Sequence, residues 1–311
     1  LHSILSCSAS PKRYRFHVFG HDLSPDDQSA IAATVAAYGA ELCAYKIDES
    51  HFRNIRMPER INRFGIESFF RLAIPDLLPP DVRYTLYLDC DILATGDLAE
   101  LFPLDWCGEA MAAGVVDRPV DPSHVRSLGL VPDRYINSGV LVINAEAWRR
   151  EKVLDRAVAW LCENLEKARL PDQDALNVLF AGRLRYLSEN WNRFANMMAS
   201  ITGGEALAED VRLVHFVGRH KPWHYHFSHP LKMEYYRYLA MTPFAGRPPL
   251  GRTPSKMWRE FSRTIRFFLS YPGMALWMLN LKAMKNRILY NHQQWPTPQP
   301  ERRQSPSPTA S

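Results

Sequence analysis

The sequence has few cysteines and no long uninterrupted apolar segment. Its five cysteines form no Cys-x-x-Cys pair and are scattered at positions 7, 43, 90, 107 and 162. This pattern favours a reduced, cytoplasmic protein over a disulfide framework. The longest apolar segment, Phe267 to Leu281, has about 15 residues and is broken by Pro272 and Gly273, whereas a bilayer-spanning helix needs ~20. With no recognisable signal peptide, the sequence predicts no membrane crossing.

Basic residues are concentrated at the end of the chain. From Gly251 onward, ten Lys or Arg residues stand against Glu260 and Glu301, a surplus larger than the net charge of +5 for the whole chain. The preceding residues are therefore acidic overall. This distribution argues against a nucleic-acid groove across the main part of the protein, and we expect no nucleic-acid partner.

Apolar segments of strand length alternate with amphipathic segments of helix length before residue 230. Strands are predicted at residues 13–20, 40–47, 84–88, 109–116 and 138–144. Helices are predicted at 24–39, 66–79 and 145–168, the first with Ser24 as N-cap. This alternation predicts an α/β domain with a largely parallel sheet.

The region from residue 251 has a different composition. Residues 251–290 mix basic residues with Trp, Phe, Leu and Met, which predicts amphipathic helices that lie at an anionic membrane surface. Two ordinary helices packed on the main domain are the alternative. Residues 291–311 are polar and rich in proline, so this tail is predicted to be disordered.

Two aspartates, Asp89 and Asp91, directly follow the predicted strand at 84–88. In open α/β sheets, ligands bind beyond the carboxyl ends of the strands. Side chains at i and i+2 of extended backbone point the same way, so both carboxylates can approach one divalent cation and leave positions for phosphate oxygens. The pair predicts a metal-diphosphate site, with a simple turn cap as the alternative.

The aspartates allow two other interpretations. An EF-hand loop is rejected because Leu93 and Ala94 would stand where it needs a ligand and a turn glycine. A haloacid-dehalogenase-type phosphatase, with Asp89 as nucleophile and Asp91 as acid and base, remains the runner-up. Leu93 stands where that family usually has Thr or Val, and its downstream lysine and acidic pair are not evident.

Five segments in order along the chain resemble one family. They are FFRLAIPDLLP, LYLDCDILATGDLAELF, YINSGVLVINAEAWR, LPDQDALNVLF and LVHFVGRHKPWH. Together they resemble the family 8 glycosyltransferases, retaining enzymes that include bacterial lipopolysaccharide galactosyl- and glucosyltransferases. The resemblance covers about residues 1–226. It implies a GT-A domain over residues 1–250, which is Rossmann-like, with a mixed, mostly parallel sheet flanked by helices.

The resemblance implies a metal site. Asp89 and Asp91 are expected to hold Mn²⁺, or alternatively Mg²⁺, on the diphosphate of a UDP-sugar, with His215 as the third protein ligand. Such an ion neutralises the charge that builds up on the leaving nucleoside diphosphate. Taken alone, His215 would be interpreted as a core histidine. Its place at the start of the segment HFVGRHKPW favours a metal ligand instead.

The resemblance also implies residues that bind the nucleotide. Cys90 is expected to offer its backbone, Gly218 to allow close approach of the phosphates, and Lys221 to supply a positive charge. Three further histidines follow without an accompanying cysteine or carboxylate. We interpret them as residues at the rim of the site or on the surface, with a zinc site as the alternative: His224, His226 and His229.

Other residues are implied to bind the sugars. Arg71 and Asp172 are expected to contact the donor sugar, and the amide oxygen of Gln173 to face its anomeric carbon. Because an amide is a poor nucleophile, we favour front-side attack, with Gln173 stabilising an oxocarbenium-like transition state. Alternatively, Asp172 caps the N-terminus of the helix that follows, and it can do so while it contacts the sugar. The strand turn of the sugar pocket is expected at Asn137, Ser138 and Gly139. Asp117 is expected near the acceptor.

The sequence therefore predicts a metal-dependent retaining glycosyltransferase that moves galactose or glucose from a UDP-sugar to a lipopolysaccharide or another surface glycan. Its expected location is the inner face of the plasma membrane, as a cytoplasmic peripheral protein. The family's first strand and nucleobase turn are not found before LHSIL, so we expect the natural start to lie upstream. A family member that binds sugar nucleotides but has lost activity is the alternative.

Overall fold

The computed structural model describes residues 1–20, 22–53, 55, 65–102, 110–195, 210–219, 221–227, 229–251 and 253. The chain divides into two compact units, Leu1–Leu250 and Gly251–Ser311. The predicted amphipathic helices and the predicted disordered tail lie outside the described residues. None of the described helices is both long enough and apolar enough to traverse a bilayer.

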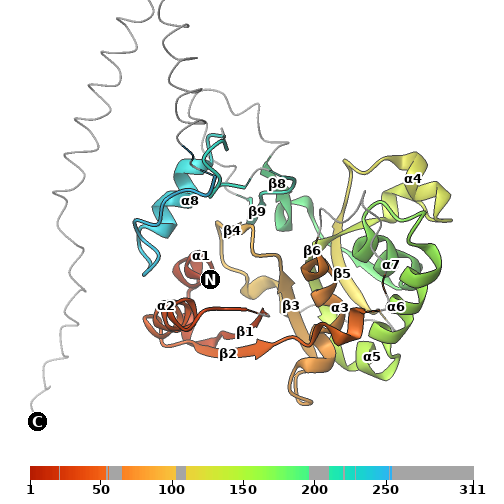
Figure 1. Cartoon of the computed structure of the whole chain (residues 1–311), viewed down its shortest axis with the longest axis horizontal. Helices are drawn as coiled ribbons and strands as arrows, with labels where there is room; N and C mark the ends of the chain where they lie inside the picture. The colour runs from red at the N-terminus through yellow and green to blue at the C-terminus, as the bar shows by residue number, and fades with distance from the viewer. Residues whose placement is uncertain are drawn as a thin grey trace, which may run out of the picture. The chain divides into compact units, whose positions relative to one another are not determined.

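A four-stranded sheet forms the centre of the first unit, in the order β3-β6-β5-β7 (Figure 1). Three of its strands run in one direction, and β6 runs against its neighbours β3 and β5. A parallel pair, β1-β2, and a small sheet, β4-β9-β8, accompany it. The strands are β1 (Arg15–Gly20), β2 (Glu41–Lys46), β3 (Tyr84–Leu88), β4 (Ile92–Ala94), β5 (Ala112–Val116), β6 (Ile136–Asn144), β7 (Leu184–Tyr186), β8 (Arg193–Phe194) and β9 (Leu213–His215).

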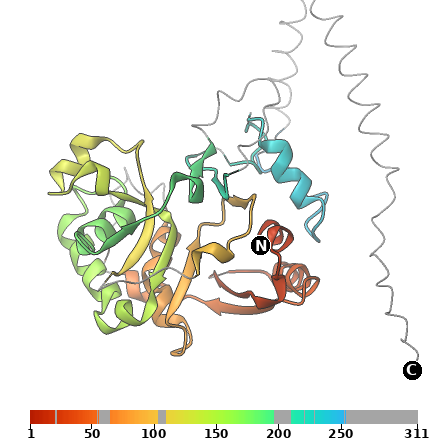
Figure 2. The ribbon, with the colours of Figure 1, turned by 180° about the vertical axis from the view of Figure 1, so that it is seen from behind.

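Helices pack beside the central sheet and bury the main core. Figures 1 and 2 show α3, α5, α6 and α7 gathered next to it, and β6 is buried along eight of its nine residues. The indole of Trp148 is fully buried in this core, where it meets the ring of Phe180 edge-on at 5.1 Å. The helices are α1 (His2–Cys7), α2 (Pro25–Ala36), α3 (Phe70–Leu77), α4 (Pro122–Ser127), α5 (Ala145–Arg150), α6 (Val153–Asn164), α7 (Pro171–Leu179) and α8 (Lys232–Leu239).

Local sequence signals place several of these elements correctly. Ser24 caps α2 by accepting the N–H of Asp27, and Gly39 follows that helix with a positive φ of 68°. Such a φ favours glycine, which has no Cβ to clash with the backbone. β3 spans the predicted residues 84–88 without change.

The single helix predicted at residues 145–168 is wrong, because the chain forms α5 and α6 instead. Lys152 between them is left-handed, with φ 51°. Trp148 and Val153 are both fully buried, yet five residues along one helix would place them about 140° apart. The break lets both enter the core. Glu151 stabilises it through two 2.7 Å hydrogen bonds from the guanidinium of Arg183.

Two strand pairings bring the functional segments together. The ladder between β3 and β6 continues past Leu88, since the Asp89 N–H donates to the carbonyl of Gly139 at 2.9 Å. Ile92 pairs with His215 across β4 and β9, and the N–H of Phe216 donates to the carbonyl of Asp91. Residues far apart in the sequence therefore meet at the carboxyl end of β3.

Replacing Trp148 by Ala is expected to lower the free energy of unfolding by about 3–5 kcal/mol, because it leaves a cavity in the main core. It also removes the donor to the Leu72 carbonyl, now 3.2 Å away. Urea unfolding measures the change. Phe102→Ala is the control, since that side chain is 53% exposed and its loss should cost less than about 0.5 kcal/mol. Equal effects of the two substitutions would contradict this assignment of the core.

Candidate active site

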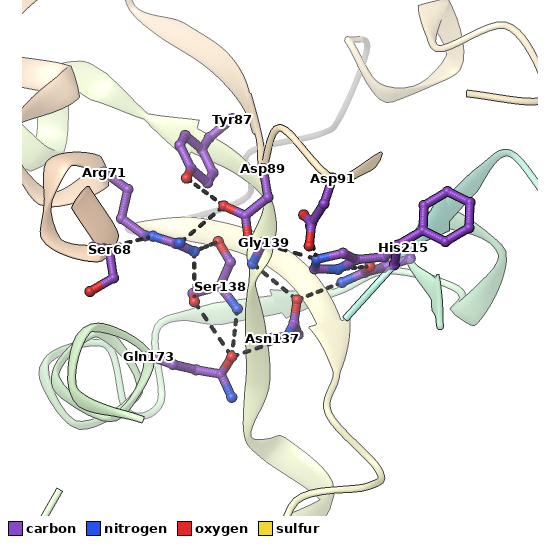
Figure 3. Close-up of polar contacts among 12 residues, drawn as sticks. Ser68, Arg71, Tyr87, Asp89, Asp91, Asn137, Ser138, Gly139, Gln173 and His215 are labelled. Carbon is purple, nitrogen blue, oxygen red and sulfur yellow. Dashed lines mark hydrogen bonds and ion pairs between the residues drawn. The ribbon is translucent and has the colours of Figure 1, made fainter. Parts of the chain in front are cut away.

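Side chains from the β3–β4 connection and from β9 converge beyond the end of β3. One ligand atom each of Asp89, Asp91 and His215 lies within 4.8 Å of the others (Figure 3). The Nε2 atom of His215 is 3.2 Å from Asp91 Oδ1 and 3.7 Å from Asp89 Oδ2. Two carboxylates and one imidazole form a suitable ligand set for a divalent cation. These are the three residues that the sequence predicted as ligands.

Gly139 leaves room for this cluster. A Cβ at this position would lie 2.3 Å from Cε1 of His215 and 2.7 Å from Oδ2 of Asp89. Both distances are shorter than van der Waals contact, so any side chain would push the two ligand residues apart. Gly139, predicted in a sugar pocket, thus lies directly against the side chains of His215 and Asp89. It lies within β6 and not in a turn.

Arg71 holds the acidic side chains on the other side of Asp89. Its guanidinium is 3.0 Å from Asp89 and 3.1 Å from Asp172, and it lies over the ring of Tyr87 at 5.0 Å. The Tyr87 hydroxyl donates to Asp89 Oδ1 at 2.5 Å. Burial raises the pKa of Tyr87 well above its usual value, so the hydroxyl remains a donor.

Asp172 is directed into the site by buried partners. Its carboxylate pairs with Arg71 and accepts the hydroxyl of Ser138 at 3.0 Å. Burial raises the pKa of Asp172, and the charge of Arg71 opposes that effect. The capping alternative is wrong for this residue, because α7 starts after the N-cap residue Leu170 and has no side-chain cap.

Both ends of the Gln173 amide are hydrogen-bonded to polar groups. Its Oε1 atom accepts the backbone N–H of Ser138 and the amide of Asn137, each at 3.0 Å. Its Nε2 atom donates to Asp117 at 2.9 Å, and Asn137 donates to the same carboxylate oxygen at 3.1 Å. Asp117, predicted on the acceptor side, is thus a buried partner of Gln173 and only 6% exposed.

The predicted nucleotide-binding residues lie near Asp91. The ammonium of Lys221 contacts the Asp91 carboxylate and donates to the Phe216 carbonyl at 2.9 Å. Burial raises the pKa of Asp91, but His215 and then Lys221 outweigh it and hold that pKa at about 2. Gly218 has a φ of 95°, which favours glycine, and Cys90 between the two aspartates is exposed.

The three downstream histidines have local structural partners, and the ring of His226 contacts that of Tyr225. His224 Nδ1 accepts the backbone N–H of Lys221 at 3.1 Å, and His229 Nδ1 accepts that of Leu231 at 3.1 Å. Within the described ranges, the only group of three or more potential metal ligands is the one at Asp89, Asp91 and His215.

Comparison with known protein families identifies the family of this chain. The model of glycosyl transferase family 8 matches residues 1–226. The chain belongs to glycosyltransferase family 8. The prediction of this family is confirmed, and the phosphatase alternative is left without support.

Individual relatives are distant. General stress protein A of Bacillus subtilis (strain 168) is 24% identical over 265 residues, which cover 80% of this chain and 91% of that protein. Lipopolysaccharide 1,3-galactosyltransferase of Salmonella typhimurium (strain LT2) is 25% identical over 242 residues, with coverages of 75% and 71%. The crystal structure of galactosyltransferase LgtC with donor and acceptor sugar analogues has a TM-score of 0.66, at 24% identity, and covers 83% of this chain and 95% of that one. This likeness confirms the GT-A fold.

Sequence reasoning missed three residues of this family 8 site. Tyr87 stands two residues before Asp89, so strand periodicity could have placed both on one face. Asn192 contacts His215, but no sequence pattern predicts that contact. Asp174 is fully buried at the start of α7 and accepts hydrogen bonds from Tyr135 and His124, the latter at 3.0 Å. Asp174 therefore anchors the turn of helix that carries Gln173.

Gly139→Ala is expected to weaken Mn²⁺ binding more than about tenfold, because the new methyl group displaces His215 and Asp89. Isothermal titration calorimetry measures the affinity. Gly96→Ala is a matched control, since its Cβ would lie 2.4 Å from Cδ of Arg212, a flexible side chain that can move. Wild-type Mn²⁺ affinity in Gly139→Ala would show that the ion binds elsewhere.

Proposed function

We propose that this protein is a metal-dependent retaining glycosyltransferase. It moves a hexose, galactose or glucose, from a UDP-sugar to a glycan acceptor such as lipopolysaccharide. The observation that carries the proposal is the convergence of Asp89, Asp91 and His215 beside the buried pair Asp172 and Gln173. A lipopolysaccharide galactosyltransferase among the similar proteins supports the substrate class.

The diphosphate end of the donor binds at the aspartate pair. Asp89, Asp91 and Nε2 of His215 would hold Mn²⁺, which suits the mixed ligand set better than Mg²⁺ with its preference for oxygen. When bound, the ion neutralises charge on the departing UDP. Lys221 adds a positive charge next to Asp91, where it can also meet a phosphate oxygen.

The sugar end of the donor binds at the start of α7. The Asp172 carboxylate is ion-paired to Arg71, which makes it a poor nucleophile and a good acceptor for sugar hydroxyls. Gln173 is fixed by Ser138, Asn137 and Asp117, so its amide dipole is preorganised beside the reacting carbon. The acceptor hydroxyl attacks from the side of the leaving group, and the leaving phosphate takes its proton. The configuration at the anomeric carbon is then retained.

The test of this proposal is release of UDP from UDP-galactose and UDP-glucose, with and without Mn²⁺. Asp89→Ala and Asp91→Ala should each lower the rate at least about 100-fold, because charge stabilisation by the ion is worth several kcal/mol. Asp26→Ala, an exposed position in the first turn of α2, is the control and should retain the rate.

The more active sugar identifies the donor. UDP binding without turnover of either sugar would favour the alternative of a binding protein that has lost activity. UDP release that persists in both aspartate variants would contradict the proposed site.

We also propose that residues 251–290 attach the enzyme to an anionic membrane, at the inner face of the plasma membrane. The support is their mixture of basic, aromatic and aliphatic residues. A lipopolysaccharide acceptor is itself embedded in a membrane, so attachment would bring the site to its substrate.

Sedimentation with vesicles that contain anionic lipid tests this attachment. Binding should fall as salt rises, because the attraction between basic residues and lipid is screened. It should also be lost when the chain ends at residue 250. Neutral vesicles are the control. Vesicle binding that is unaffected by salt and by the truncation would contradict the proposal.

A further inference from the structure

Asn192 links the two halves of the site. It follows the 3₁₀ turn Glu189–Trp191, directly before β8, and its side chain is buried, with 3% exposure for the residue. Its Oδ1 atom lies 2.9 Å from Nδ1 of His215. Its Nδ2 atom lies 2.9 Å from Oδ1 of Asn137. One amide therefore bridges a predicted metal ligand and a residue that holds Gln173.

A backbone group fixes the direction of these hydrogen bonds. The N–H of Gly139 donates to Oδ1 of Asn137 at 3.0 Å, so this oxygen is an acceptor. The Asn192 atom that faces it must then be the donor Nδ2, which leaves Asn192 Oδ1 facing His215. Because an amide oxygen only accepts, Nδ1 of His215 must carry a hydrogen.

The second nitrogen of the imidazole is thereby committed to the aspartates. With a hydrogen on Nδ1, Nε2 is the only ring nitrogen that can offer a lone pair to a cation. That same atom faces Asp91 and Asp89, at 3.2 Å and 3.7 Å. The opposite tautomer would direct an N–H at the cation site and leave Asn192 Oδ1 without its donor.

We propose that Asn192 is a positioning residue for the metal site. It selects the tautomer of His215 that binds a divalent cation, and it ties the orientation of this ring to Asn137 and, through Asn137, to Gln173. The proposal rests on the proposed function, because it assumes a cation at Asp89, Asp91 and His215. In metal sites generally, a second partner that orients the imidazole contributes about 10–100-fold to metal affinity.

Two substitutions of Asn192 separate orientation from packing. Asn192→Ala removes the acceptor of His215 Nδ1–H and should weaken Mn²⁺ binding by about 10–100-fold. Asn192→Asp loses the donor to Asn137 but keeps an oxygen acceptor for the His215 hydrogen, as in carboxylate-histidine-metal sites. It should stay within about threefold of the wild type, because the bond to His215 is the one that selects the tautomer. Electron paramagnetic resonance of free Mn²⁺, with the full chain and the metal alone, measures both affinities.

The controls are a nearby amide and the histidine itself. Asn190→Ala removes an amide two residues earlier that donates to Asp210 at 2.7 Å, and it should leave Mn²⁺ affinity unchanged. If His215→Ala lowers the affinity but Asn192→Ala does not, this inference is wrong and the proposed metal site stands. If His215→Ala has no effect, the metal site itself is wrong.

Thermal unfolding of each variant separates loss of binding from loss of structure. Equal weakening of Mn²⁺ binding in folded Asn192→Ala and Asn192→Asp would contradict the inference, because a charged carboxylate would then restore nothing. If Asn192→Ala does not fold, Asn192→Asp still decides the matter. A folded Asn192→Asp protein that binds Mn²⁺ like the wild type supports the role of the acceptor oxygen, and a folded protein that binds it weakly contradicts that role.

Discussion

Two backbone N–H groups, those of Ser138 and Gly139, set the directions of the hydrogen bonds on which the site depends. Both belong to β6, which is paired with β3 and β5, so they are held by the central sheet. One donates to Gln173 and the other to Asn137. Unlike a side-chain amide, a backbone N–H cannot exchange its donor for an acceptor. The orientation of Gln173, of Asn137 and, through Asn192, of His215 follows from these two bonds.

Charges of both signs lie within the same small volume. Asp89, Asp91 and Asp172 bring three carboxylates together, and buried carboxylates need partners to remain ionised. Arg71 pairs with Asp89 and Asp172, while Lys221 pairs with Asp91. These ion pairs fix the geometry of the acidic side chains. The arrangement explains why basic residues from α3 and from the segment after β9 are part of one site.

Much of this arrangement could be predicted from the sequence. The strand before Asp89 and the N-cap at Ser24 are local signals, and the ordered motifs placed the chain in its family. Features that depend on tertiary contacts could not be predicted. The break at Lys152 reflects the burial of both Trp148 and Val153. Asn192 contacts His215 because β8, which follows Asn192, pairs with β9. The hydrogen bond from Gln173 to Asp117, a residue predicted on the acceptor side, is another such contact.

The most direct test of the account is a crystal structure with Mn²⁺ and UDP, with the ion located by its anomalous scattering. The account predicts one ion bound by Asp89, Asp91 and Nε2 of His215. It also predicts that Nδ1 of His215 remains hydrogen-bonded to Asn192, which is 2.9 Å away in the present structure. An ion coordinated by other residues, or a His215 ring turned so that Nδ1 meets the ion, would contradict the central claim.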